Sequence, residues 1–362
     1  MGTEKILRNN LTRQVMPFID FTAIVKEAWQ AYDKTREIVR IVDISAKVST
    51  NHVYRVTFKD RSFIIAKLSY YGQHAHFVED HTIINSLSNN LPAPFENVLA
   101  RSLMKGNELF VYRFKSIILD AWVVFYRPIK IKQRLPRRLD EEQIIKLGEQ
   151  VALLHKACYS IRNTLPTSSK TMQVDIDSLL HELETDEGRY EHRMHEDEIK
   201  NQSALFLENY DKLGAGNFDK IPVFVDWNIG NFSVSPSFRL YSRWDYDWFR
   251  MDSRMLDFYF LSRVVSDIGD RTVFSYNIGP LTEKRFLLFL HAYHEVYPFT
   301  ENEIRFLKEV YRFFILNYVI KDGRYFFHEI FATKLQKEAY DIYLPSIEKG
   351  FNADIILKAL NM

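Results

Sequence analysis

Glycine and cysteine are scarce in this sequence. Its 362 residues include 12 glycines, which is about half of the usual frequency of roughly 7%. A glycine-rich loop that cradles phosphates therefore has little material to be built from. The single cysteine, Cys158, excludes a disulfide framework and any multi-cysteine zinc or iron–sulfur site, and it indicates a reducing compartment.

Net charge and long apolar runs are lacking too. The chain has 48 basic and 47 acidic residues, a net charge of +1, so we expect no overall attraction to nucleic acid or to a membrane surface. The longest apolar stretches, such as SIILDAWVVFY, are too short to span a bilayer and contain Asp120. The start of the chain lacks the apolar core of a signal peptide, and Ile6 stands where a myristoylation motif needs Ser or Thr. We expect a soluble, cytoplasmic protein, and no pattern indicates its oligomeric state.

What is present is typical of a folded chain with a bulky interior. Hydrophobic residues make up 46% of the sequence, charged residues 26% and aromatic residues 15%, which excludes a disordered or fibrous protein. At roughly 150 residues per domain, the length predicts two domains or one domain with two lobes.

Hydrophobic periodicity predicts a strand-rich first third. Residues 20–34 have helical spacing, with Asp20 as the expected N-cap. Segments rich in β-branched and aromatic residues then predict five strands, over 37–45, 52–60, 61–69, 108–115 and 121–129. One helix, over 77–90, is inserted after the third strand and ends at the prolines that follow it.

After about residue 138 the pattern is mostly helical. Residues 140–157 predict a helix that is capped by Asp140 and has one apolar face. A charge-laden helical stretch covers 175–200, and several long helices are expected over 281–343. Residues 221–249 interrupt this pattern and predict a strand, a turn and a second strand.

The hairpin of residues 221–249 carries the clearest chemistry. Asp226 and Asn231 lie five positions apart across a turn, and Asp245 and Asp247 end the returning strand. Carboxylates and an amide at the mouth of one hairpin suit Mg²⁺ and the orientation of a hydroxyl, which phosphoryl transfer requires. Asp and Asn also favour turns for structural reasons alone, and the D-x-x-x-x-N spacing by itself does not separate the two interpretations.

The first third supplies further residues of the same chemistry. The segment IIAKL places Lys67 inside an apolar strand, where an unpaired ammonium is costly. Glu79, in the following helix, is its expected partner. A strand lysine, a helix glutamate, a D-x-x-x-x-N loop and a metal aspartate appear in the order that protein kinases use.

These motifs resemble those of the aminoglycoside phosphotransferase and choline-kinase superfamily, small-molecule kinases with a protein-kinase-like fold. The resemblance extends from about Glu37 to Tyr343. It implies an α+β, two-lobed fold with a small β-rich N-lobe and a larger, mostly helical C-lobe. The expected divisions are an N-terminal helical extension over 1–36, the N-lobe over 37–127 and the C-lobe over 128–362.

The resemblance implies ATP and Mg²⁺ as cofactors. The implied reaction transfers the γ-phosphoryl group to a hydroxyl of a small molecule. Asp226 is then the catalytic base, and Asn231 and Asp245 are the metal ligands. Lys67, polarised by Glu79, is implied to hold the nucleotide phosphates.

The resemblance also places the rest of the nucleotide. The turn that contains Ser49 and Asn51 resembles the family's first hairpin turn, which lies over the phosphates in place of a glycine-rich loop. The adenine is expected between the lobes, near Phe125, Tyr126 and Arg127.

Phe224 departs from the family pattern, because members usually carry histidine two residues before the catalytic aspartate. Residues 146–157 match the family's helix that ends in a leucine–histidine pair. Asp257, twelve residues after Asp245, matches a second, structural aspartate, but the element MDSR before it is altered. A nucleotide-binding pseudokinase that acts through a protein partner is therefore the alternative function.

Three further segments have simpler interpretations. Residues 74–81 contain three histidines and two acids, but helical geometry spreads the histidines and disfavours a metal centre. Residues 127–138 carry six basic residues and no acid, and they predict a solvated linker rather than a site for nucleic acid or a phosphorylated substrate. Residues 181–200, with eight acidic and three basic residues, predict an exposed helix; on a substrate side they would suit a cationic amine.

Overall fold

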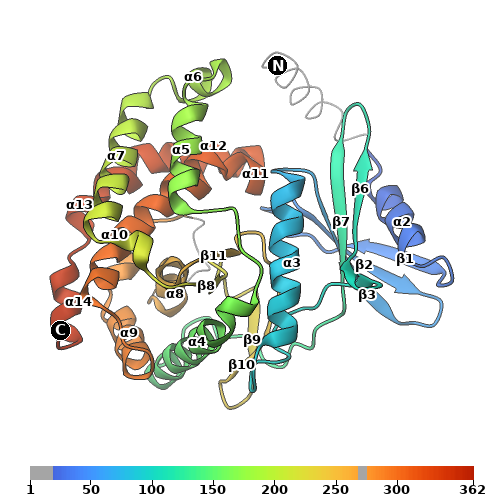
Figure 1. Ribbon diagram of the computed structural model, residues 1–362, viewed down its shortest axis with the longest axis horizontal. Coiled ribbons are helices and arrows are strands. Elements are labelled where there is room, and N and C mark those ends of the chain that lie inside the picture. Colours follow the sequence, from blue (N-terminus) through green and yellow to red (C-terminus); the bar gives the residue numbers. More distant parts are fainter. Residues whose placement is uncertain (1–18, 268–274) are drawn as a thin grey trace.

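The computed structural model describes residues 19–267 and 275–362, so the first 18 residues of the expected N-terminal extension lie outside the described part. A small lobe built on a β-sheet lies beside a larger helical lobe, with helix α3 (His74–Asn90) between them (Figure 1). No helix within the two described ranges is long and apolar enough to cross a membrane.

The small lobe is a five-stranded antiparallel sheet with the order β1-β2-β3-β7-β6. Its strands are β1 (Ile38–Asp43), β2 (His52–Phe58), β3 (Phe63–Ser69), β6 (Val111–Lys115) and β7 (Asp120–Tyr126). A short hairpin of β4 (Met104–Lys105) and β5 (Glu108–Leu109) precedes β6. All five predicted strands are confirmed, because their β-branched and aromatic residues pack well on a pleated surface.

The sheet separates two cores, since successive side chains of a strand point to opposite faces. The face turned away from the large lobe packs against α2 (Phe21–Tyr32), whose first turn is capped by Asp20 as expected (Figure 1). The buried residues of this outer core include Trp29, Ala66, Leu68 and Phe125. Residues of the alternate positions, Val124 and Tyr126 among them, belong to the core that continues into the large lobe.

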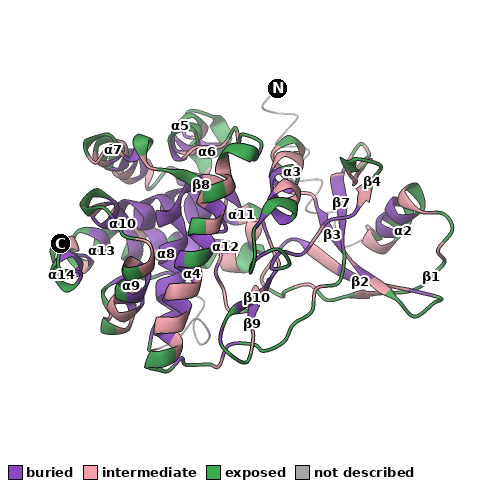
Figure 2. Ribbon diagram, turned by 60° about the horizontal axis from the view of Figure 1, so that its bottom comes forward, coloured by how far each residue is buried: buried purple, intermediate pink, exposed green. Residues whose placement is uncertain are grey.

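The large lobe is mostly helical, and the inward faces of its helices are buried (Figure 2). Its α-helices are α4 (Glu141–Ile161), α5 (Met172–Glu182), α6 (Asp186–His192), α7 (Glu196–Lys212), α8 (Phe258–Val265), α9 (Lys284–Val296), α10 (Glu301–Phe314), α11 (Gly323–Phe326), α12 (Glu329–Glu338), α13 (Leu344–Gly350) and α14 (Ala353–Ala359). Asp140 starts α4 with a capping box, as its sequence predicts. Two π-helical segments, Ile315–Lys321 and Ala339–Tyr343, follow α10 and α12.

Two nested hairpins replace the single strand–turn–strand expected over 221–249. β9 (Phe232–Val234) pairs with β10 (Leu240–Arg243), and the flanking β8 (Lys220–Val223) and β11 (Arg250–Ser253) pair with each other. The β9–β10 hairpin lies at the junction of the two lobes (Figure 2). Each outer edge of this hairpin forms an isolated β-bridge with another segment. One bridge is to Leu99, which precedes β7 in the chain, and the other is to Gln133, which follows β7.

Candidate active site

Lys67 holds the small lobe against the end of β10. Its strand alternates between the two cores, which leaves Lys67 on the face toward the large lobe with only 6% of its side chain exposed. Lys67 Nζ donates to Asp245 Oδ1 at 2.8 Å and lies 2.5 Å from Asp247 Oδ1. Burial disfavours the charged ammonium, but the two carboxylates outweigh it and the pKa of Lys67 lies above its usual value.

Asp245 and Asp247 both pair with Lys67, but their pKa values are shifted in opposite directions. Burial opposes the charge of Asp245, but Lys67 overcomes it and holds the pKa of Asp245 below its usual value. Burial, together with the neighbouring Asp245 carboxylate, raises the pKa of Asp247 to about 6. Asp245 has a left-handed backbone, φ 68°, which an aspartate tolerates better than most residues and which is common at functional sites.

The turn before β2 closes over this ion cluster. Asn51 Nδ2 donates to Asp247 Oδ2 at 2.7 Å, and Ser69 Oγ donates to Asn51 Oδ1 at 2.7 Å. Ser49 Oγ accepts from the backbone N–H of Asn51 at 3.1 Å. Asn51 therefore bonds the carboxylate of Asp247, which is paired with the lysine that the sequence assigned to phosphates, while Ser49 supports the turn.

Asp226 and Asn231 meet at the start of β9. Asn231 Nδ2 donates to Asp226 Oδ2 at 2.9 Å, and the N–H of Asn228 donates to Asp226 Oδ1 at 3.1 Å. The carbonyl of Asn231 accepts from the N–H of Trp244 at 3.0 Å, which places Asn231 next to the residue that precedes Asp245. The structure thus pairs Asp226 with Asn231, pairs Asp245 and Asp247 with Lys67, and links the two pairs through the backbone of Asn231 and Trp244.

A buried aspartate braces the backbone just before Asp226. Asp257 Oδ1 accepts from the N–H groups of Phe224 and Val225 at 2.9 and 2.6 Å, and Asp257 Oδ2 hydrogen-bonds His155 Nε2 at 3.0 Å. Val225 has φ 59°, a conformation that is strained for a β-branched residue and persists only when its surroundings enforce it. The two hydrogen bonds from the loop to Asp257 supply that enforcement, and they give Asp257 the structural role that its match implied.

Phe224 and Arg243 stabilise the same loop from its other side. Phe224 is buried among aromatic rings, with the Arg243 guanidinium 4.5 Å from its ring centre. Arg243 Nη2 also donates to the backbone carbonyl of Asp226 at 2.9 Å. At the position where the family usually has histidine, the loop is therefore held by packing and by a cation on an aromatic face.

The expected pairing of Lys67 with Glu79 is wrong. Glu79 Oε1 accepts from Ser168 Oγ at 2.8 Å and from the N–H of Ser169 at 2.7 Å. Residues two apart on a helix point about 200° apart, and in α3 it is His81 that turns toward the sheet, where its Nε2 hydrogen-bonds the Tyr126 hydroxyl. Burial lowers the pKa of His81 to about 3, which keeps its imidazole neutral. The residue that α3 turns toward the sheet therefore supplies no carboxylate for Lys67.

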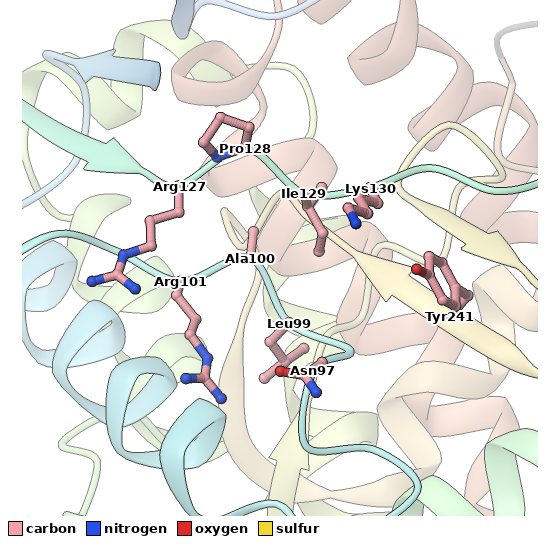
Figure 3. A pocket seen from close by; sticks show the side chains of 9 residues that line it. All are labelled: Asn97, Leu99, Ala100, Arg101, Arg127, Pro128, Ile129, Lys130 and Tyr241. Atoms are coloured by element: carbon pink, nitrogen blue, oxygen red, sulfur yellow. The ribbon is translucent and has the colours of Figure 1, made fainter. Parts of the chain in front are cut away.

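Two of the three residues expected near the adenine lie away from the cluster around Lys67. Phe125 is fully buried in the outer core beneath α2, because its neighbours Val124 and Tyr126 take the opposite face of β7. Arg127 lines a separate pocket of about 510 Å³ at the end of β7 (Figure 3). This pocket is lined by Asn97, Leu99, Ala100, Arg101, Arg127, Pro128, Ile129, Lys130 and Tyr241, and it includes none of the charged residues of the candidate site.

The histidines of α3 form no metal centre. His81 Nδ1 hydrogen-bonds the carbonyl of Phe77, and the His74 ring packs edge-on against Trp122. Within residues 19–267 and 275–362, no three His, Cys, Asp or Glu side chains converge as a metal site. The oxygen donors of Asn231 and Asp245 suit Mg²⁺, which proteins usually hold by one or two carboxylates together with phosphates and water.

An acidic cluster lies where α5 and α6 approach α11. Burial raises the pKa of Glu182 to about 7, and the charges of Asp322, Glu191 and Glu187 add to the shift while Lys321 opposes it. The same acids surround the ring of Tyr325, whose backbone carbonyl accepts from the hydroxyl of Thr50. The predicted exposed acidic helix is therefore in part a half-buried acidic wall beside the turn of Ser49 and Asn51.

Sequence reasoning named Asp247 at the end of the returning strand but did not predict that it pairs with Lys67. It missed Arg243 and Thr50 altogether. Neither carries a local signal, since each acts through a backbone carbonyl of another segment.

Comparison with known proteins shows the fold of the chain. Neither a protein-family model nor a curated protein matches the sequence. An amicoumacin kinase solved with AMP-PNP and Ca²⁺ superposes with a TM-score of 0.58 at 12% identity, over 94% of this chain and 97% of the other. A microcompartment-associated aminopropanol kinase gives 0.55 at 15% identity over 92% and 99%, and the GDP complex of an aminoglycoside 2′-phosphotransferase gives 0.55 at 10% over 92% and 100%. The likeness confirms the two-lobed, protein-kinase-like α+β fold that the sequence resemblance implied.

Proposed function

We propose that this chain, on a fold it shares with solved small-molecule phosphotransferases, transfers the γ-phosphoryl group of ATP to a hydroxyl of a small molecule. The observation that carries the proposal is the junction of the two lobes, where Lys67 meets Asp245 beside the hydrogen-bonded pair of Asp226 and Asn231. A cation for phosphates, two oxygen donors for a metal and a carboxylate for the acceptor are the parts that phosphoryl transfer requires.

Each side chain then has one task. Lys67 contacts the nucleotide phosphates, and Asn231 and Asp245 hold Mg²⁺, which neutralises phosphate charge when it is bound. Asp226 orients the acceptor hydroxyl and takes its proton while the acceptor oxygen bonds to the γ-phosphorus and the bond from that phosphorus to the β-phosphate oxygen breaks. ADP leaves with the electron pair of the broken bond. Asp257 acts indirectly, by keeping the loop of Asp226 in its strained conformation.

The acidic wall favours an acceptor that carries an amine. Arg324 is paired with Glu191 and Lys321 with Asp322, and Lys321 also offsets the charge of Glu182 in part. Glu182 and Glu187 leave this wall with an excess of negative charge. A cationic acceptor would gain from this wall through opposite charge in a partly buried setting. The structural neighbours include an aminopropanol kinase and an aminoglycoside phosphotransferase, whose names are consistent with such an acceptor.

A nucleotide-binding pseudokinase is the second candidate. Two observations favour it. Lys67 is already paired with two carboxylates, and nucleotide phosphates must displace them at least in part to reach it. Phe224 also stands where the family usually has histidine. In that case the chain binds nucleotide without turnover and acts through a protein partner.

The test is ADP release with Mg-ATP and a panel of amino alcohols, aminoglycosides, sugars and other hydroxylated metabolites. We expect release that depends on an amine-bearing acceptor. Asp226→Asn should lower the single-turnover rate by about 10²–10⁴-fold, the usual contribution of a general base, with little change in Mg-ATP affinity. The exposed Asp177→Asn on α5 serves as a matched control.

Two results would contradict the proposal. A nucleotide-dependent rise in Tm without turnover of any acceptor supports the pseudokinase. Near-normal turnover of Asp226→Asn shows that the D-x-x-x-x-N segment is only a turn.

A further inference from the structure

The turn before β2 is tied to a segment almost at the other end of the chain. Ser49 forms an antiparallel bridge with Phe327, between α11 and α12. The N–H of Thr50 donates to the carbonyl of Phe326 at 3.2 Å, and the N–H of His328 donates to the carbonyl of Val48 at 3.2 Å. The Thr50 hydroxyl also donates to the carbonyl of Tyr325, across a separation of 275 residues. We call this pairing of residues 48–51 with 325–328 the latch.

The latch continues directly into the ion cluster. Thr50 is 3% exposed and is followed by Asn51, whose amide holds Asp247. Asp247 in turn is paired with Lys67. A continuous set of contacts therefore runs from residues 325–328, at and after the end of α11, through the turn, to the lysine proposed to hold phosphates.

The latch spans the two lobes at the phosphate end of the proposed nucleotide site. The turn belongs to the small-lobe sheet, and residues 325–328 belong to the large lobe. While the latch is closed, the turn is fixed to both lobes, and its Asn51 covers the carboxylates beside Lys67. These contacts keep the turn from moving away from the carboxylates beside Lys67.

We infer that the latch positions the turn over the nucleotide phosphates and must open each time that nucleotide enters or leaves. The inference rests on the proposed function, because it assumes that nucleotide binds between Lys67 and the turn. Thr50 and the segment 325–328 are then positioning elements of the phosphate site, and the opening of the latch limits the rate of nucleotide exchange.

The geometry of the latch allows a direct test by a reversible cross-link. The two backbone hydrogen bonds flank Ser49 and Phe327, which makes them a non-hydrogen-bonded pair with Cα atoms about 4.5 Å apart. That separation lies within the range of about 4.4–6.8 Å found in disulfides. The only native cysteine, Cys158, is buried, so the double variant Ser49→Cys/Phe327→Cys gives one defined disulfide.

The measurement is the uptake and release of a fluorescent ATP analogue with Mg²⁺, before and after oxidation. Protein oxidised without nucleotide should take up the analogue at least tenfold more slowly, and protein loaded before oxidation should release it at least tenfold more slowly. Reductant should restore both rates. A contact that serves only stability would leave both rates unchanged, and equal rates in the oxidised and reduced states overturn the inference.

A second pair of variants keeps the inference testable if the double variant does not fold. Thr50→Val loses the hydroxyl that bonds the Tyr325 carbonyl, and release should become about two- to tenfold faster, the effect of one hydrogen bond. Thr50→Ser keeps the hydroxyl and should restore the slow rate. Equal release from Thr50→Val and the unmodified chain overturns the latch. Failure of the unmodified chain to bind the analogue at all overturns the proposed function, and the latch as a nucleotide gate with it.

Discussion

The candidate site contains two clusters of charged and polar groups, a rear cluster at Asp257 that bonds the loop of Asp226 and a front cluster at Lys67, and they are built differently. In the rear cluster, Asp257 is fully buried, and its oxygens are bonded by two backbone N–H groups and by His155, whose Nδ1 lies 2.8 Å from the Tyr293 hydroxyl. In the front cluster, Lys67 faces Asp245 and Asp247, whose side chains are 39% and 21% exposed.

This difference in construction indicates that the rear cluster holds the loop in place and that the front cluster binds ligands. The rear cluster satisfies its one carboxylate with protein donors in fixed geometry, so it holds one conformation of the loop. The front cluster has two carboxylates for one ammonium and is open to solvent in part, so a cation and a phosphate can exchange with the contacts now made. The predictions below test whether the rear cluster sets stability and the front cluster sets nucleotide binding.

Asp257→Asn should have the largest effect on stability. An asparagine keeps one oxygen for the N–H groups of Phe224 and Val225, but it presents an NH2 group to His155 where Asp257 has a second oxygen, and it removes the carboxylate charge from all of these hydrogen bonds. We expect the free energy of unfolding to fall by about 3 kcal/mol, as for a broken buried ion pair or charge-assisted hydrogen bonds. Urea denaturation measures it, with exposed Asp177→Asn as the control. A loss below about 1 kcal/mol would show that the loop does not depend on the brace.

Lys67→Met should act mainly on nucleotide binding. The variant removes the cation of the front cluster, and Mg-ATP affinity should fall by about 10- to 100-fold, the range of a charged hydrogen bond. The unfolding free energy should change less than in Asp257→Asn, because the carboxylates that lose their partner are partly exposed. Isothermal titration calorimetry gives the affinity, and Lys59→Met, which removes an exposed lysine paired with Glu37, is the control. Unchanged affinity in Lys67→Met contradicts the assignment of the front cluster.

Asp247→Asn should change how stability depends on pH. The pKa of Asp247 is raised to about 6 in the folded chain, so between about pH 4 and pH 6 the folded state binds more protons than the unfolded state and loses stability as pH rises. An asparagine resembles the protonated form and removes this loss. The variant should therefore gain about 1–2 kcal/mol relative to the unmodified chain between pH 4 and pH 7. The free energy of unfolding of the variant and of the unmodified chain is measured against pH. If the two curves run parallel, the raised pKa of Asp247 is refuted.

Glu182→Gln should give the smallest effect and tests charges outside both clusters. The pKa of Glu182 is raised to about 7 by burial and by neighbouring acids, so folded-state stability falls as pH rises from about 4.5 to 7. The variant should be about 1 kcal/mol more stable than the unmodified chain at pH 8 and equal to it at pH 4. Thermal unfolding at the two pH values measures this. A variant that is less stable than the unmodified chain at pH 8 would show that the Glu182 carboxylate makes a stabilising contact that outweighs its repulsion by the neighbouring acids.

Local features of the sequence were sufficient for the capped helices, for the strands of the small lobe and for the meeting of Asp226 with Asn231. Asp20 and Asp140 cap the helices they were expected to cap, because a cap depends on a few neighbouring residues. The strands follow from a period of two, which is equally local. The hairpin residues Asp226 and Asn231 come together because they lie five positions apart in one turn.

Only the tertiary structure decided which side chains meet across those elements. The spacing of α3 allowed Glu79 to reach Lys67, but the rotation of the docked helix presents His81 to the sheet and sends Glu79 to Ser168. The latch joins residues 275 positions apart. No local sequence pattern predicts it, because its hydrogen bonds come largely from backbone groups that nearly every residue has. Periodicity and caps are short-range effects that a sequence displays directly, whereas the choice of a partner depends on the packing of distant segments, and that choice exists only in the folded chain.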